Sequence, residues 1–379
     1  MLLITKKTLL ATLLTLVLFS VATPLSAGSC PLITEVGLPS VVGSGAWLGD
    51  ELVVVDFFQR ELFRYSHAGV QKASRPLSAI QGLPQSYEPR AIRADGSQVT
   101  LQFNGGQFAQ LGQGLEVMGR WNLASRRSQQ REDGREILRI YSTWVKSGDY
   151  IFYCGDFQTG GGYESGFAVS SWPSVDTVEE VRLVDSAAQE MAYCRLNLPN
   201  LAAGEDGTFY ALVSDSVAGE PETSTQIMKV EADEGGIEWK LLNDRVRFPP
   251  RPELPRFRND EGFAAVMKKM ERSIMPAGLF LDPRGDRLYV LLREPEGPTV
   301  TWSLQSVDAE TGKKIGKPTV LPSQSPHLIV VPGVEQWALL EQGVALGFKE
   351  IRSKGLRLVS ADDIRRASDS PTGGEICTP

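Results

Sequence analysis

The sequence predicts an all-β fold built from repeated antiparallel meanders. The clearest unit lies between Met275 and Pro322, where short turns such as Pro283–Asp286 and Glu310–Lys313 separate four β-rich runs. Asp and Gly in such turns favour tight reversals, and short runs at this rhythm are typical of an antiparallel meander. A self-contained meander of about 45 residues has the size of one blade of a β-propeller.

The same pattern recurs along the chain. A turn containing Gly or Asp precedes a β-rich second strand in GDELVVVD, DGSQVTLQF, SGDYIFYCG, EDGTFYALVSD and RGDRLYVLLRE, with a weaker sixth copy in PGVEQWALLEQG. Six copies at a spacing of roughly 45 to 80 residues indicate a degenerate repeat, with insertions in the longer gaps. We therefore predict a β-propeller of six four-stranded blades, as a single domain over residues 28–379. A seven-bladed ring that also uses Pro31–Ser40 is the alternative.

The first three units follow from apolar runs and their turns. Leu52–Val55 is apolar at every position, which predicts a strand buried on both faces. The predicted strands are Ala46–Leu48, Glu51–Phe57, Glu61–Ser66 and Gly69–Ala73; Ala91–Ala94, Gln98–Phe103, Phe108–Leu111 and Leu115–Trp121; Ile137–Val145, Tyr150–Asp156, Gly166–Ser171 and Glu179–Val184.

The last three units follow in the same way. The predicted strands are Ala192–Leu198, Thr208–Val213, Thr225–Glu231 and Ile237–Leu241; Ala277–Asp282, Arg287–Arg293, Thr299–Asp308 and Lys314–Leu321; His327–Val331, Gln336–Glu341, Val344–Ile351 and Leu356–Val359.

An insertion at residues 243–275 interrupts the rhythm between the fourth and fifth units. Its first half, DRVRFPPRPELPRFR, is rich in proline, which favours extended backbone outside a regular ladder. The second half predicts a helix near residues 259–274 that begins at Asn259 or Asp260. Its apolar stripe contains Phe263, Val266, Met267, Met270 and Ile274. We expect this helix to cover a propeller face or rim, and a lid or docking element is the functional alternative.

Residues 1–27 have the features of a secretory signal peptide. A cationic start is followed by an apolar run from Leu9 to Ala22, a proline at Pro24 and then small residues. The predicted cleavage follows Ala27, with cleavage after Ser29 as a competitor. An uncleaved anchor and a lipoprotein attached through Cys30 are weaker alternatives, since Ala27 stands where a lipoprotein signal favours leucine. We predict a secreted or periplasmic protein with no transmembrane span after signal removal.

The four cysteines predict two disulfide bonds, because an even number in an exported chain indicates pairing. A ring brings its ends together, so Cys30 and Cys377 are expected to pair. Cys154 and Cys194 lie in neighbouring units and form the second expected pair. Without a CxxC spacing, a metal site built on cysteine is not expected.

The sequence presents no catalytic motif. The two histidines, His67 and His327, are far apart, with His67 predicted in an exposed turn and His327 at the start of a strand. Five carboxylates precede second strands, and turn chemistry explains their recurrence, although carboxylates that converge would suit calcium. These residues are Asp50, Asp95, Asp149, Asp206 and Asp286. We therefore assign no catalytic, cofactor-binding or metal-binding residue, and no cofactor.

The formal net charge of −7 argues against nucleic-acid binding, because such proteins carry a basic footprint. Two arginine-rich segments stand out against this background. They contain Arg120, Arg126, Arg127, Arg131 and Arg135, and Arg245, Arg247, Arg251, Arg256 and Arg258. We expect them in solvated surface loops, and the functional alternative is contact with an acidic protein or an anionic surface polymer.

The repeated units over Gly43–Val359, with the blade-like VDAETGKKIG at Val307–Gly316, make the chain resemble the six-bladed β-propeller superfamily, which includes NHL-type and TolB-like propellers. The resemblance implies either a non-catalytic binding or scaffold protein or a calcium-dependent, lactonase-like hydrolase. A lactonase-like site would need acid and amide ligands that converge on the channel, and the sequence alone does not place Asn197 or Asn200 there. Because no site chemistry is evident, the non-catalytic function is preferred, with an unknown protein or surface polymer as partner.

Overall fold

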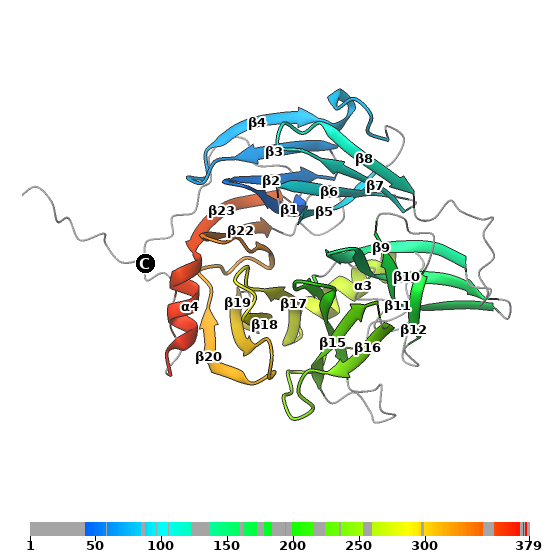
Figure 1. Ribbon diagram of the computed structural model, residues 1–379. Coiled ribbons are helices and arrows are strands. Elements are labelled where there is room, and N and C mark those ends of the chain that lie inside the picture. The colour runs from blue at the N-terminus through cyan, green and yellow to red at the C-terminus, as the bar shows by residue number, and fades with distance from the viewer. Residues whose placement is uncertain are drawn as a thin grey trace, which may run out of the picture.

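Six antiparallel sheets form a ring in the computed structural model (Figure 1). The structure describes residues 42–57, 59–84, 88–95, 97–104, 106–122, 136–159, 162–172, 178–183, 194, 199–214, 224–234, 236–252, 260–296, 299–343, 352–371, 374 and 376. The ring is a six-bladed β-propeller, which confirms the predicted fold. Pro31–Ser40, on which the seven-bladed alternative depended, lie outside the described residues.

Each blade is a meander whose strands pair in chain order. The first three blades contain β1 (Val42–Leu48), β2 (Glu51–Asp56), β3 (Glu61–Tyr65) and β4 (Gln71–Pro76), followed by η1 (Leu77–Ala79); β5 (Pro89–Asp95), β6 (Gln98–Phe103), β7 (Gln107–Leu111) and β8 (Val117–Asn122); β9 (Glu136–Ser147), β10 (Tyr150–Thr159), β11 (Gly162–Ser171) and β12 (Val178–Leu183).

The other three blades contain β13 (Leu201–Ala203), β14 (Thr208–Ser214), β15 (Thr225–Asp233) and β16 (Gly236–Leu241); β17 (Met275–Leu281), β18 (Arg287–Glu296), β19 (Thr299–Asp308) and β20 (Lys314–Val320); β21 (His327–Val331), β22 (Gln336–Gly343) and β23 (Arg352–Ser360). The helix α3 (Asp260–Glu271) precedes the fifth blade and α4 (Ala361–Asp369) follows the sixth.

The first strand of each blade faces the centre of the ring. These strands contact one another in order, β1 with β5, β5 with β9, β9 with β13 and β13 with β17, and β21 contacts β1 to close the ring. Trp47 Nε1 donates to the carbonyl of Val331 at 3.1 Å, and Gln336 Nε2 donates to the carbonyl of His67 at 2.7 Å. Packing of β21 against β1 and these two side-chain hydrogen bonds therefore join the sixth blade to the first.

The ring has two faces that differ in their connections. On the connecting face, the last strand of one blade leads to the first strand of the next. On the turn face, each first strand turns into the second, and glycine adopts a positive φ there at Gly49, Gly148, Gly207 and Gly285. Because residues with a side chain rarely adopt this backbone region, glycine marks the turn. The predicted turn motif is therefore confirmed at these four positions.

Two predicted strands are wrong. The fourth blade begins with Leu201–Ala203, whereas Cys194, inside the predicted strand Ala192–Leu198, is helical. In the sixth sheet Leu356–Val359 pairs directly with β22 and takes the third position, where the sequence had assigned the fourth. The strand predicted at Val344–Ile351 lies outside the described residues. Both errors arise because the connection before each strand has a length that the sequence pattern does not fix, so the strand was assigned to the wrong residues or the wrong position in its blade.

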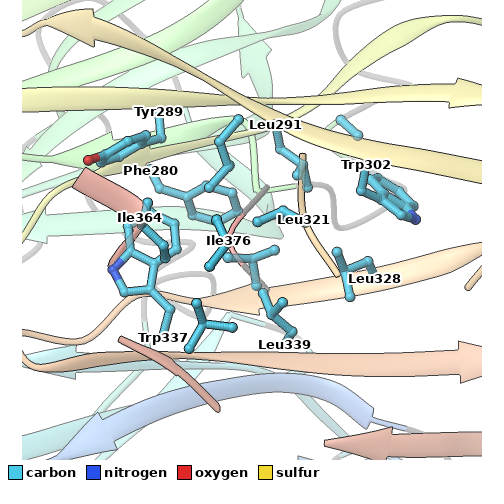
Figure 2. Close-up of a cluster of buried hydrophobic side chains, with 14 of the residues drawn as sticks. Phe280, Tyr289, Leu291, Trp302, Leu321, Leu328, Trp337, Leu339, Ile364 and Ile376 are labelled. Atoms are coloured by element: carbon cyan, nitrogen blue, oxygen red, sulfur yellow. The ribbon is translucent and has the colours of Figure 1, made fainter. Parts of the chain in front are cut away.

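Hydrophobic clusters fill the spaces between successive blades. Leu52 and Val54 of β2 face the sixth blade, whereas Val53 and Val55 face the second, as expected for a strand buried on both sides. Between the fifth and sixth blades, Tyr289 and Trp337 pack edge to face with their ring centroids 5.1 Å apart (Figure 2). Burial of this apolar surface is the main stabilisation of the ring.

The C-terminal helix α4, which the sequence analysis did not predict, joins the fifth and sixth blades. Its N-cap Ser360 accepts a hydrogen bond from the Asp363 amide at 3.4 Å. Ala361 and Ile364 are buried in the cluster between the two blades, and the helix packs on β20. Ion pairs then fix its polar side: Arg284 with Asp362, Arg287 with Asp369, and Arg365 with Asp282 and Asp286.

These ion pairs predict that the contact of α4 weakens at acidic pH. A hydrogen bond from Arg365 holds the pKa of Asp286 below its usual value, and one from Arg284 does the same for Asp362. Carboxylates with a depressed folded-state pKa contribute stability above their unfolded-state pKa of about 4, and this contribution is lost as pH falls through the folded-state value. Arg365→Gln should therefore destabilise the protein most at neutral pH.

Urea unfolding of wild type and Arg365→Gln at a series of pH values measures this effect. The difference between their free energies of unfolding should shrink steadily below about pH 4. A difference that stays constant to about pH 2 would contradict an electrostatic role for Arg365.

Candidate functional site at the centre of the ring

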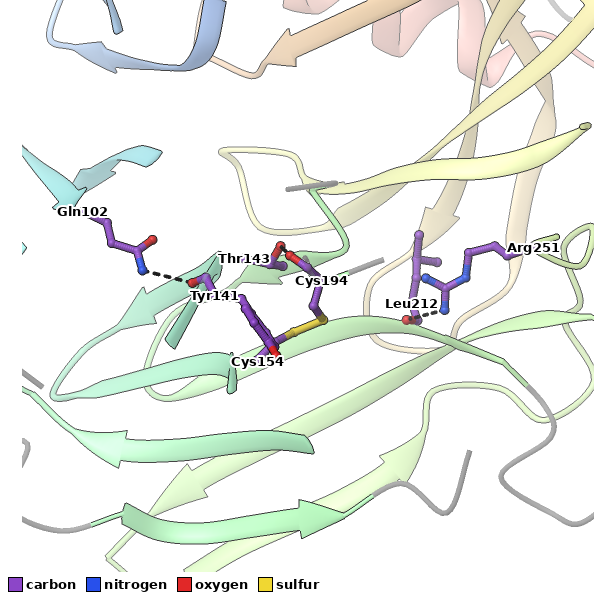
Figure 3. The surroundings of a disulfide bond; sticks show 7 residues. All are labelled: Gln102, Tyr141, Thr143, Cys154, Cys194, Leu212 and Arg251. Atoms are coloured by element: carbon purple, nitrogen blue, oxygen red, sulfur yellow. Dashed lines mark hydrogen bonds between the residues drawn. A yellow bond between two sulfur atoms is a disulfide. The ribbon is translucent and has the colours of Figure 1, made fainter. Parts of the chain in front are cut away.

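A disulfide bond joins the third blade to the connection that leads into the fourth. Cys154 lies on β10 and Cys194 in the connecting segment, with their Cα atoms 6.1 Å apart (Figure 3). Both side chains are buried. This confirms the pairing expected for Cys154 and Cys194. The other expected pair, Cys30 and Cys377, lies outside the described residues.

Polar side chains around this disulfide link neighbouring parts of the ring. Thr143 Oγ1 donates to the carbonyl of Cys194 at 3.0 Å, and Gln102 Nε2 of the second blade donates to the carbonyl of Tyr141 at 3.0 Å (Figure 3). The Tyr141 hydroxyl donates to Asp156. Because these groups are buried, such bonds offset the cost of removing them from water. Their observed roles are structural.

The described part of the proline-rich half of the insertion, residues 244–252, lies along the connecting face of the fourth blade. Phe248 forms a β-bridge with Thr225, and Thr225 Oγ1 donates to the carbonyl of Pro249 at 3.0 Å. Arg251 is only 3% exposed, and its Nη2 donates to the carbonyl of Leu212 at 3.2 Å (Figure 3). The expected surface loop is therefore wrong for Arg251, because backbone pairing draws this segment onto the blade.

Three other arginines of the two arginine-rich segments are exposed, in contrast to the buried Arg251. Arg245 and Arg247 are exposed, as expected, and Arg120 is exposed on β8. The remaining members, Arg126, Arg127, Arg131, Arg135, Arg256 and Arg258, lie outside the described residues.

The helix α3 begins at Asp260, within the predicted boundary, and lies inside the outline of the ring in Figure 1. Val266 is fully buried and Met270 is 9% exposed, which confirms that part of the predicted stripe is packed. Ile274, however, follows the helix end and is 50% exposed, so its place in the stripe was wrong. The side chains of Phe263 and Met267 lie outside the described residues.

A buried arginine from the fifth blade holds the end of α3. Arg293 Nη1 donates to the carbonyls of Met270 and Ser273 at 2.8 and 3.4 Å, and its guanidinium lies 5.9 Å from the centre of the Trp302 ring. The last carbonyls of a helix carry partial negative charge and need donors, which a guanidinium supplies. Lys268, Lys269 and Arg272 are exposed, as is Ile274 after the helix end.

A second arginine lies among the inner strands. Arg93 of β5 donates from Nη1 to Ser44 Oγ at 2.7 Å and to the carbonyl of Ile92 at 3.0 Å. Burial disfavours the charged form and lowers the pKa of Arg93 to about 10. Arg93 was not among the residues predicted from the sequence. A signal was present, since Arg93 is a charged residue in the predicted inner strand Ala91–Ala94.

The predicted turn carboxylates whose side chains the structure describes do not converge. Asp50, Asp149 and Asp206 are exposed in separate turns, whereas Asp286 binds Arg365. Within the described residues, no group of three or more His, Cys, Asp or Glu side chains lies close enough to hold a metal ion. The side chain of Asp95 lies outside the described residues.

The remaining residues singled out by sequence are also located. His67 is exposed and pairs with Glu335 at 3.3 Å, and His327 opens β21, as predicted. Asn200 is 2% exposed, and within the described part of the chain its amide oxygen and nitrogen make no hydrogen bond. Asn197 lies outside the described residues.

No protein-family model and no curated protein matches this sequence. The chain has the six-bladed β-propeller fold. Solved structures with similar folds include a member of the DUF4221 family from Bacteroides vulgatus, with 11% identity, a TM-score of 0.49, and coverage of 88% of this chain and 98% of that one.

Two further solved structures also have similar folds. A calcium-binding regucalcin from Agrobacterium tumefaciens has 9% identity, a TM-score of 0.43, and coverage of 93% of this chain and 98% of that one. A hypothetical selenium-binding protein from Sulfolobus tokodaii has 10% identity, a TM-score of 0.46, and coverage of 94% and 90%. At these identities the comparisons concern the fold alone, because one fold hosts many unrelated functions.

Proposed function

We propose that the protein is a secreted or periplasmic, non-catalytic binding or scaffold propeller that uses the connecting face, with α3 at its centre, to hold an acidic partner. The supporting observation is the attachment of α3 to the ring. Arg293 donates a hydrogen bond to the C-terminal end of α3, and Val266 on the same helix is fully buried. A helix fixed in this way presents its exposed side chains in a set arrangement, which lowers the entropic cost of binding.

The exposed side of α3 supports an acidic partner. Lys268 and Lys269 lie in the last helical turn, Arg272 follows, and Ile274 adds exposed apolar surface. Arg245 and Arg247 of the insertion are exposed as well. The lysines also complement the helix dipole, but their clustering on a chain of net charge −7 favours a partner of opposite charge at this face.

Two observations support the proposed location outside the cytoplasm. The buried disulfide Cys154–Cys194 is of the kind that persists in oxidising compartments. The signal-like features of residues 1–27 supply a route of export. Among the described residues, no helix is long and apolar enough to cross a membrane.

Binding of polyanions to α3 tests the proposal. The mature chain should be retained at low ionic strength on immobilised heparin or poly-glutamate, and Lys268→Glu/Lys269→Glu should elute at clearly lower salt. A matched control is Lys313→Glu/Lys317→Glu, which makes the same charge change at exposed positions of the fifth blade. Interactions between exposed charges are screened beyond about 8 Å at physiological salt, so a local contact should respond to the first variant alone.

Equal elution of both variants would contradict a role for α3. The two matrices also separate a polysaccharide from an acidic polypeptide as the preferred partner. Hydrolysis of a simple lactone that requires calcium and stops with EDTA would overturn the non-catalytic part of the proposal and favour the lactonase-like alternative.

A further inference from the structure

Arg93 is held by groups from three successive blades near the centre of the ring. Ser44 of β1 accepts from Arg93 Nη1 at 2.7 Å and donates its own proton to the carbonyl of Ile92 at 3.0 Å. On the other side, the Arg93 guanidinium carbon lies 6.0 Å from the centre of the Trp144 ring on β9. Ser44 and Trp144 are 5% and 1% exposed, so the surroundings of the guanidinium are fixed.

The bonds of Arg93 leave one edge of its guanidinium available. Both protons of Nη1 are used, one for Ser44 and one for Ile92. In the part of the chain that the structure describes, Nε and Nη2 donate to no acceptor, although the side chain retains partial solvent exposure. These two nitrogens carry parallel N–H bonds, the arrangement that matches the two oxygens of a carboxylate.

The described residues also leave the positive charge of Arg93 uncompensated. Among the described residues, no carboxylate forms an ion pair with it, whereas Arg64, Arg284, Arg287, Arg357 and Arg365 each have one. Although its pKa is lowered to about 10, the group stays charged at neutral pH. A partly desolvated charge without a partner is costly, and an anion that replaces its lost hydration recovers part of this cost.

We propose that Arg93, positioned by Ser44 and flanked by Trp144, binds the carboxylate group of a small ligand that enters the centre of the ring. A carboxylate fits better than phosphate or sulfate for two reasons. Its planar pair of oxygens matches the Nε and Nη2 edge, and its single negative charge is balanced by one guanidinium. A doubly charged anion would leave one negative charge uncompensated in the same partly desolvated site.

The carboxylate site goes beyond the proposed function, because it is separate from the exposed surface of α3. Successive blades repeat the same strand order, so the inner strands run in one direction along the ring. The helix α3 ends where β17 begins, on the connecting face. Arg93 is the fifth residue of the seven in β5, and therefore lies toward the turn face. A small ligand can thus be tested independently of a partner on α3.

Calorimetric titration of the mature protein with acetate and benzoate tests the site. We expect one carboxylate molecule to bind per chain. Benzoate should bind more tightly than acetate if its aromatic ring contacts the Trp144 side chain. Arg93→Gln should weaken binding roughly 10- to 100-fold, because hydrogen bonds to charged groups contribute more than neutral ones. Arg93→Lys keeps the charge but lacks the paired donors and should bind with intermediate affinity.

Arg90→Gln is the matched control, because Arg90 is exposed on the same strand and bonds to Asn104 and Glu88. It removes the same charge and should bind both probes as wild type does. Lys268→Glu/Lys269→Glu should also leave the affinity unchanged. A cooperative thermal unfolding transition verifies that each variant is folded. If Arg93→Gln does not fold, the affinity of Arg93→Lys relative to wild type tests the proposal.

Three results would overturn the proposal. The first is the absence of saturable binding of either carboxylate by the wild-type protein. The second is equal affinity of wild type and both Arg93 variants. The third is tighter binding of inorganic phosphate than of acetate at equal ionic strength, which would remove the assignment to a carboxylate.

Discussion

Removal of the Cys154–Cys194 disulfide is expected to lower the free energy of unfolding by about 4 kcal/mol. The two cysteines are separated by 40 positions, and closing a loop of this length restricts the unfolded chain to that extent in the chain-entropy model. The bond also anchors the connection between the third and fourth blades, where Thr143 binds the carbonyl of Cys194. Urea unfolding of Cys154→Ala/Cys194→Ala measures the loss.

Thr143→Val serves as the control for this experiment. It removes the hydrogen bond to Cys194 and keeps the disulfide, so it should cost only about 1 kcal/mol. If the double cysteine variant loses no more than Thr143→Val, packing of the connection and not the covalent bond determines its stability. Since both cysteines are buried, wild type should also resist reduction by a thiol until it unfolds.

Gly207→Ala is expected to destabilise the protein by about 3 kcal/mol. Gly207 has a φ of +77°, where a side chain costs about 1–2 kcal/mol. A Cβ atom at this position would lie 2.1 Å from the carbonyl oxygen of Ala232, so the backbone must also shift. The amide of Gly207 donates to Ser147 of the third blade, and a shift would disturb this contact between blades.

Gly285→Ala separates the two effects. Gly285 occupies the equivalent turn of the fifth blade with a φ of +83°, but a Cβ atom there would meet nothing within 4 Å. It should therefore cost only the conformational part, about 1 kcal/mol. Both free energies come from urea unfolding under the same conditions. Equal losses would show that the close approach to Ala232 is relieved without cost.

Sequence patterns were sufficient for most of the propeller because its signals are local. Gly285 and the alternating strands around it identify a blade without knowledge of the remaining chain. The apolar run Leu52–Val55 requires cover on both sides, and the ring supplies it from two neighbouring blades. The pairing of Cys154 with Cys194 followed once these residues were assigned to adjacent blades.

The candidate sites were less accessible to sequence reasoning. Arg251 and Arg245 lie in one arginine-rich segment, yet the first is buried against Leu212 and the second is exposed. Ser360 followed by Asp363 is a local helix-start pattern that would have predicted α4, but the prediction did not include this helix. Arg93 is conspicuous only when Ser44 and Trp144, from different blades, are placed beside it.

The sequence alone therefore determined the six repeated units, four of their turns, the packed part of α3 and one disulfide. Each depends on residue types and spacings within a short stretch of chain or between adjacent units. The tertiary structure decided which arginines are buried, where α4 docks and how Arg93 meets its neighbours. These outcomes depend on contacts between residues tens to hundreds of positions apart, and the free energy of a charge is set by the groups that the fold places around it.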